Sequence, residues 1–136
     1  MAESGPMTLF SLAQRGMSAQ LVRMNAAASN LANAGSLSGS AEATYRPLRP
    51  VFATQLDAAS GLATVQVTAI TRSTAAPVKE HMPDNPLADA DGNVWSAPVD
   101  ENAEMVEMLD ASRQYQNLVE ALSTAKQLML DTMRMK

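Results

Sequence analysis

The stretch from Asp100 to Lys136 constrains the fold more than any other part of this sequence. It contains neither proline nor glycine, so nothing in it interrupts a helix. Apolar residues recur three or four positions apart over about three heptads, which is the spacing of an amphipathic helix. They are Met108, Ala111, Tyr115, Leu118, Leu122, Ala125 and Met129. A helix from Glu101 to Met133 would be roughly 50 Å long, so it requires a second long element to cover this stripe.

The charges of this stretch fit a helix of the same length. Asp100 can cap the start by accepting backbone N–H bonds. Glu101 and Glu104 follow where negative charge is favourable, and Arg134 lies near the end where positive charge is favourable. The sequence therefore predicts both ends of the helix as well as its apolar face.

A second helix is predicted from Met7 to Asn33. Its apolar residues form one stripe: Phe10, Ala13, Met17, Leu21, Met24, Ala28 and Leu31. The stretch from Ser4 to Ala41 has no acidic residue, so the two helices differ in charge, and we expect them to pair, either parallel or antiparallel. Gly16 is either a tolerated glycine, which costs about 1 kcal/mol relative to Ala, or a point where the helices approach closely.

The middle of the chain predicts a small β-rich insert. Tyr45 to Gln55 contains two prolines and is expected to be an extended edge segment. Gly61 to Arg72 alternates apolar and polar residues and is the best strand. Asp91-Gly92 is a turn signal, across which Asn93 to Trp95 could pair. The remaining passages, Ala34 to Ala43 and Ala76 to Pro86, are expected to be loops and turns.

These elements predict a mainly α fold with a small β-rich insert. The N-terminal helix within residues 1–34 and the C-terminal helix within residues 100–136 are expected to pair as one coiled-coil-like helical domain, with residues 35–99 as the loop and β-rich insert. The first six residues are expected to be disordered, as chain ends often are.

The composition argues against several functions. A net charge of −4 disfavours a dedicated nucleic-acid binder, and no apolar run is long enough for a membrane span. The sequence has no cysteine and a single histidine, His81, so it lacks the ligands of a transition-metal site. The acidic turn around Asp89 lacks the distal ligands of a calcium loop. We expect no cofactor, no metal and no enzymatic activity.

Two groups of motifs resemble the bacterial flagellar axial proteins, which include rod and hook subunits. The run from Asn25 to Asn33 (NAAASNLAN) is similar to the signature at the N-terminal helix of that family. The stretch from Pro86 to Met129, with Tyr45-Arg-Pro47, resembles the short proximal-rod members. The matching motif residues are Asn25, Asn30, Asn33, Asp89, Gly92, Glu104, Met105, Arg113, Tyr115, Gln116 and Lys126. The chain departs from the family pattern at Asn85, Asn93 and Ala97-Pro98, all of which lie in the insert.

The resemblance implies a structural subunit of the proximal rod of the flagellar basal body. Its partners would be copies of itself, the other proximal and distal rod proteins, the rod–MS-ring junction protein and the flagellar type III export apparatus, and it would not insert directly into a membrane. It would reach the periplasmic rod without a cleaved signal peptide, and the N-terminus shows no such signal. The alternative is a soluble helical adaptor or export chaperone that binds partners through its apolar stripe.

The apolar stripes of both helices are the expected assembly seam. Docking against neighbouring subunits would bury side chains that one chain cannot cover alone. The seam residues are Phe10, Met17, Leu21, Met24, Leu31, Met108, Tyr115, Leu118, Leu122 and Met129.

Overall fold

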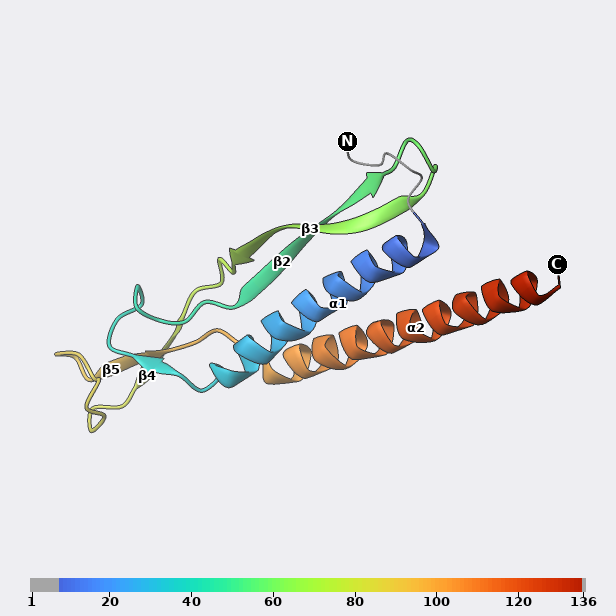
Figure 1. Ribbon diagram of the computed structural model, residues 1–136. Helices are drawn as coiled ribbons and strands as arrows, with labels where there is room; N and C mark the ends of the chain where they lie inside the picture. Colours follow the sequence, from blue (N-terminus) through green and yellow to red (C-terminus); the bar gives the residue numbers. More distant parts are fainter. Residues whose placement is uncertain (1–7, 136) are drawn as a thin grey trace.

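Two long helices lie at the two ends of the described chain. The computed structural model describes residues 8–135; the expected disordered tail and Met7, the first residue of the expected N-terminal helix, lie outside this part. Helix α1 spans Leu9–Ala32 and helix α2 spans Glu101–Arg134. Terminal helices around a small β-rich insert were expected, and this outline is confirmed (Figure 1).

Both helices begin at residues that cap them. The Thr8 side chain accepts a hydrogen bond from the Ser11 backbone N–H at 3.1 Å, and Asp100 accepts one from the Ala103 N–H at 3.2 Å. Each cap satisfies one of the N–H groups that the first turn leaves without a partner. The start of α2 predicted at Asp100 is therefore confirmed.

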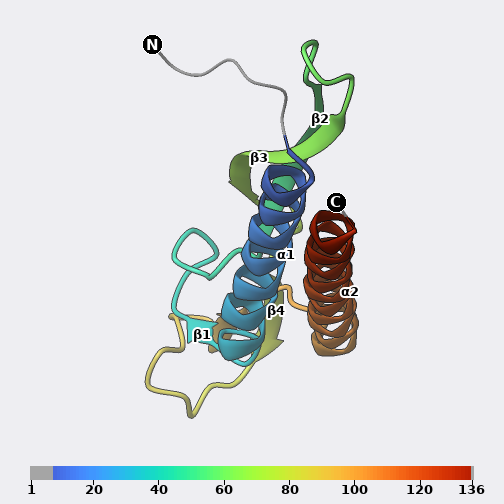
Figure 2. The ribbon, with the colours of Figure 1, turned by 45° about the vertical axis from the view of Figure 1, so that its right-hand side comes forward.

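The helices pack side by side and run antiparallel. Arg23 of α1 contacts Glu107 of α2, whereas Gly16, further back in α1, lies against Leu118, further along α2. Figures 1 and 2 show the two helices side by side, and Figure 1 shows the last part of α2 projecting past the start of α1. This geometry resolves the choice between parallel and antiparallel pairing.

A β-hairpin lies along α1 on the side away from α2 (Figure 1). Strands β2 (Leu48–Leu56) and β3 (Ala63–Arg72) pair antiparallel, with an irregularity between Val51 and Phe52. The hairpin turn is closed by a 2.6 Å hydrogen bond from the Ser60 hydroxyl to the Asp57 carboxylate, and it ends at Gly61, whose φ of 71° favours glycine. Both extended segments predicted from the sequence are confirmed.

A second, three-stranded sheet lies near the end of the molecule where α1 ends and α2 begins (Figure 1). It has the order β1 (Leu37–Ser38), β5 (Asn93–Ser96) and β4 (Val78–His81), all antiparallel. Asn93 to Trp95 was correctly predicted to pair. The predictions of loop at residues 37–38 and of turns at 78–81 were wrong, because both short segments are held as strands by β5, which lies between them.

The interior of the described chain is thin and built from small residues. Most of the buried apolar residues are alanines: Ala13, Ala19, Ala26, Ala27, Ala97 and Ala111, together with Val94. In α1 the most buried side chains face two layers, the hairpin and α2, whereas the sequence pattern predicted a single stripe. Ala26 and Ala27 are therefore buried while Ala28 is exposed.

Candidate assembly surfaces

The two helices meet along a line of half-buried side chains. On α2 this line contains Met108, Tyr115, Leu118, Leu122 and Ala125, with Ala111 fully buried among them. On α1, Phe10, Met17, Met24 and Leu31 are half-buried. Most of the expected seam residues are therefore partly covered within one chain, and each keeps some surface for a neighbour.

Gly16 lies where the helices come closest. A Cβ added at this position would lie 3.0 Å from Leu118 Cδ1, which is at the limit of side-chain contact. Of the two interpretations of Gly16, the close approach is confirmed, and the glycine allows a leucine of the partner helix to pack directly on the α1 backbone.

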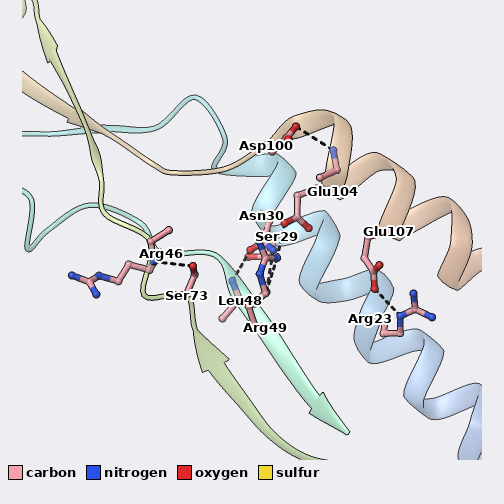
Figure 3. Close-up of polar contacts among 12 residues, drawn as sticks. Arg23, Ser29, Asn30, Arg46, Leu48, Arg49, Ser73, Asp100, Glu104 and Glu107 are labelled. Carbon is pink, nitrogen blue, oxygen red and sulfur yellow. Dashed lines mark hydrogen bonds and ion pairs between the residues drawn. The ribbon is translucent and has the colours of Figure 1, made fainter.

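Arg23 ties the two helices together at the opposite end of this contact. Its Nε donates to Glu107 Oε1 at 2.7 Å (Figure 3). A second guanidinium nitrogen donates to Asp110 Oδ2 at 2.8 Å. The hydrogen bond to Glu107 is the main cause that raises the pKa of the Arg23 guanidinium; Asp110 adds to it, and partial burial opposes it. The charge contrast between the helices therefore becomes a specific contact that fixes their register.

Asn30 joins α1 to the first residues of the hairpin. It is fully buried, and its Oδ1 accepts from the Leu48 N–H and from the Tyr45 hydroxyl, both at 2.8 Å. Its Nδ2 donates to the Leu48 carbonyl at 3.1 Å. One side chain thus pairs the main chain of Leu48 as a neighbouring strand would, and we infer that it sets where the hairpin leaves the helix (Figure 3).

Arg49 and Glu104 form the contact between the hairpin and α2. Arg49 donates to Glu104 Oε1 at 2.6 Å, and Glu104 is only 3% exposed whereas the Arg49 side chain is about half exposed. A buried carboxylate needs such a partner because removal from water costs several kcal/mol. Together Asn30, Tyr45, Leu48, Arg49 and Glu104 make what we call the polar junction.

Two further motif residues shape backbone turns. Asp89 Oδ1 accepts from the N–H groups of Asp91 and Asn93, both at 2.9 Å, and this bends the chain into β5. Gly92 has φ of 78°, and a Cβ there would lie 3.1 Å from both His81 and Pro83. The Asn33 side chain similarly closes the end of α1 by donating to the Ser29 carbonyl at 2.8 Å.

Other expected residues lie on the surface of the described chain. Among the seam residues these are Leu21, which is 43% exposed, and Met129, which is 53% exposed. Among the motif residues they are Asn25, Met105, Arg113, Gln116 and Lys126. The motif thus divides into residues that hold the subunit together and residues that face outward.

Two apolar surfaces were not predicted from the sequence pattern. Met105, Val106 and Leu109 form what we call the outer patch, on the side of α2 away from α1, and Leu109 is 68% exposed. The second surface, the overhang, is the exposed segment from residue 126 to 135, the end of α2 with its cap residue, which contains Leu128, Leu130 and Met133. The sequence carried a signal for both, since these residues fall beside the seam of a long helix. The roles of Arg23, Arg49 and Tyr45 had no such local signal.

Within residues 8–135, no three or more His, Asp or Glu side chains lie together in a group that could hold a metal ion. Neither helix of that region is both long and apolar enough to cross a membrane. The notable features of the described chain are therefore its contacts between elements and its exposed apolar surfaces.

Comparison with known proteins identifies the class. A family model described as the C-terminal region of the flagellar basal-body rod proteins FlgEFG matches residues 90–135. The flagellar basal-body rod protein FlgC of Salmonella typhimurium is 44% identical over 129 residues, which cover 93% of this chain and 95% of that protein. FlgC of Yersinia enterocolitica is 40% identical over 127 residues, and FlgC of Agrobacterium fabrum is 30% identical over 122.

These relatives place the chain among the structural proteins of the flagellar basal-body rod. Within that class it belongs to the FlgC family. The resemblance inferred from the sequence motifs is confirmed, and the family is one of structural proteins and not of enzymes.

Proposed function

We propose that this protein assembles with copies of itself and with other rod proteins into the helical tube of the proximal rod, which transmits torque. The observation that carries the proposal is the exposure of large apolar side chains along α2. They are Met105, Val106, Leu109, Val119, Leu128, Met129, Leu130, Met133 and Met135. Clustered apolar surface of this kind is typical of a surface that contacts a partner.

The assembly seam is proposed to act together with these surfaces. Full burial of a large seam side chain contributes about 1.5–3 kcal/mol, against which the entropy of ordering the chain must be set. The described chain half-covers most of the seam and leaves Leu21 and Met129 exposed. Neighbouring subunits would complete the burial, so assembly and ordering would stabilise each other.

We further propose that the paired helices behave as a coiled-coil-like unit. This proposal includes the domain division expected from the sequence. Residues 1–34 and 100–136 form one helical domain, and residues 35–99 form the insert. The packing of Leu118 on Gly16 and the spacing of the half-buried α2 residues support it. The insert would then lie outside the helical layer and contact other subunits.

The partners and route to the rod are carried over from the family. They are the proximal and distal rod proteins, the rod–MS-ring junction protein and the flagellar type III export apparatus, with the periplasmic rod as the destination. The relatives' shared description as basal-body rod proteins supports the location. It does not favour the alternative of a soluble adaptor or export chaperone.

The direct test is to determine whether the chain is in the rod. Flagellar basal bodies purified from cells that make this protein should contain it, and imaging with a labelled chain should place it inside the rod. Basal bodies that are complete without the protein would contradict the proposal.

A substitution at an exposed seam residue extends this test. Leu21→Asp should leave the isolated subunit folded, because the side chain is 43% exposed, and should abolish swimming by blocking assembly. Asn25→Asp, at an exposed polar position of the same helix, is the matched control. Cells with this variant should swim better than cells with Leu21→Asp. Normal motility with Leu21→Asp would remove Leu21 from the assembly seam.

A further inference from the structure

The overhang exists because the two helices differ in length. Helix α2 has 34 residues and α1 has 24. Starting from the Gly16–Leu118 contact, the first residue of α1 lies opposite residue ~125 of α2, because both helices rise by about 1.5 Å per residue. The residues from Lys126 onward are all exposed within the described chain. Met129 and Met133 of the overhang continue the face that α1 covers earlier along α2.

The outer patch lies near the other end of α2 and on a different face. Met105 and Leu109 are four residues apart and Val106 lies beside them, so they form one surface on the side away from α1. Their exposed fractions are 52%, 68% and 66%. The described chain offers nothing that covers this surface.

The charges beside the two surfaces are opposite in sign. Glu101 precedes Met105 by one helical turn and makes no ion pair among the described residues, whereas Glu107 and Asp110 are paired with Arg23 of α1. Lys126 precedes Leu130 by one turn and likewise has no ion pair in the described part, and Arg134 follows. Among the described residues, the outer patch therefore begins beside an unpaired carboxylate, and the overhang begins with an unpaired ammonium group.

We propose that the overhang of one copy packs in parallel on the outer patch of the next copy, with Lys126 opposite Glu101. This joint rests on the proposed rod function and names a second copy of the chain as the partner. A shift of about 25 residues along α2 is close to seven whole turns at 3.6 residues per turn. It places Lys126 beside Glu101 and Leu130 beside Met105, and it brings Met133 within one residue of Leu109.

The joint explains how such a subunit builds an open assembly. It uses two different surfaces, so each copy that receives an overhang still presents its own. A contact of this kind continues along a helical array instead of closing into a dimer. The Lys126–Glu101 pair favours one relative orientation of the two copies more than it raises their affinity, because exposed ion pairs are individually weak.

Cysteine pairs test the joint within assembled rods. The chain has no cysteine of its own, so Leu109→Cys with Met133→Cys introduces the only thiols. In oxidised basal bodies, this double variant should give disulfide-linked dimers and longer ladders of the chain, because a disulfide requires Cα atoms about 4.4–6.8 Å apart. The matched control, Leu109→Cys with Thr71→Cys on exposed β3, should remain monomeric.

The outcomes separate the joint from the proposed function. If the double variant is incorporated into rods but stays monomeric, or if it links to a different protein, the joint is wrong while the rod function stands. Absence of the chain from the rod overturns both. As a second measurement, Glu101→Lys and Lys126→Glu should each lower the ladder yield by up to about fivefold, and the combined charge exchange should restore it. Equal loss in the combined variant would also overturn the pairing.

Discussion

The two ends of the helix pair differ in the kind of side chain that dominates each of them. Where α1 ends and α2 begins, polar side chains connect α1, α2 and the hairpin through the buried Asn30 and Glu104 and the partly exposed Arg23 and Arg49 (Figure 3). Where α1 begins and α2 ends, the described chain shows large apolar side chains in solvent, including Met133 at 70% exposure. The first end contains the interactions that define one subunit, with the outer patch on its far side, and the second contains surface that one subunit cannot bury.

This difference shows how a protein with a small interior can adopt one defined fold and still present apolar surface for assembly. The interior holds mostly alanines, which contribute little hydrophobic stabilisation each. Polar contacts with fixed geometry then determine which elements meet and in what register. The larger apolar residues are left for contacts between subunits, so substitutions at the two ends should have separable effects.

The largest effect on the subunit is expected at Asn30. Asn30→Ala removes three hydrogen bonds from a fully buried site and leaves the Leu48 N–H and the Tyr45 hydroxyl without that partner. We expect a loss of about 3 kcal/mol in the free energy of unfolding, measured by urea denaturation followed by circular dichroism. Asn25→Ala, at an exposed asparagine of the same motif, should change stability by less than about 0.5 kcal/mol. Equal effects would show that the polar end does not define the subunit.

The Arg49–Glu104 pair should give the next largest effect, and an asymmetric one. Arg49→Met leaves the buried Glu104 carboxylate without its only hydrogen bond in the described chain, which we expect to cost about 2–3 kcal/mol. Glu104→Gln keeps an oxygen that can accept from Arg49 and should cost about 1 kcal/mol. Urea denaturation of both single variants and of Arg49→Met with Glu104→Gln measures the coupling. If Arg49→Met lowers the free energy of unfolding less than Glu104→Gln does, Glu104 is not a buried charge that depends on Arg49.

The close approach at Gly16 should give a smaller effect that depends on its partner. Gly16→Leu overlaps Leu118 and should destabilise by about 1–2 kcal/mol, after allowing for the better helix propensity of leucine. In a Leu118→Ala background the same substitution should cost less, because the overlapping side chain is gone. Ala28→Leu, at an exposed position of α1, is the control and should be nearly neutral. If Gly16→Leu lowers the free energy of unfolding equally in both backgrounds, the introduced side chain does not overlap Leu118.

The sequence predicted the features that depend on local pattern. The two helices, the cap at Asp100, and strands β2 and β3 follow from periodicity, capping chemistry and alternation. For Gly16 the sequence left two interpretations open, a tolerated glycine or a close approach of the helices, and the structure shows the second. The family followed from motif residues that are spread over most of the chain.

Features that depend on distant parts of the chain were missed. Strands β1 and β4 have two and four residues, too few to show alternation, and they are stable because β5 pairs with both. The partners of Arg23 and Arg49 lie 84 and 55 residues away along the chain, and no local pattern encodes that register. The outer patch could not be separated from the seam, because exposure is known only once the face covered by α1 is fixed.

The smallest effect on the subunit, and the sharpest contrast with Asn30, is expected in the overhang. Met133→Ser removes an apolar side chain that is 70% exposed, so the free energy of unfolding should change by less than about 0.5 kcal/mol. Swimming and the amount of the chain in purified basal bodies should nevertheless fall. Gln127→Ser, at an exposed polar position of the same segment, should leave both unchanged. If Met133→Ser lowered the free energy of unfolding as much as Asn30→Ala does, the overhang would belong to the interior of the subunit. The distinction between the two ends would then fail.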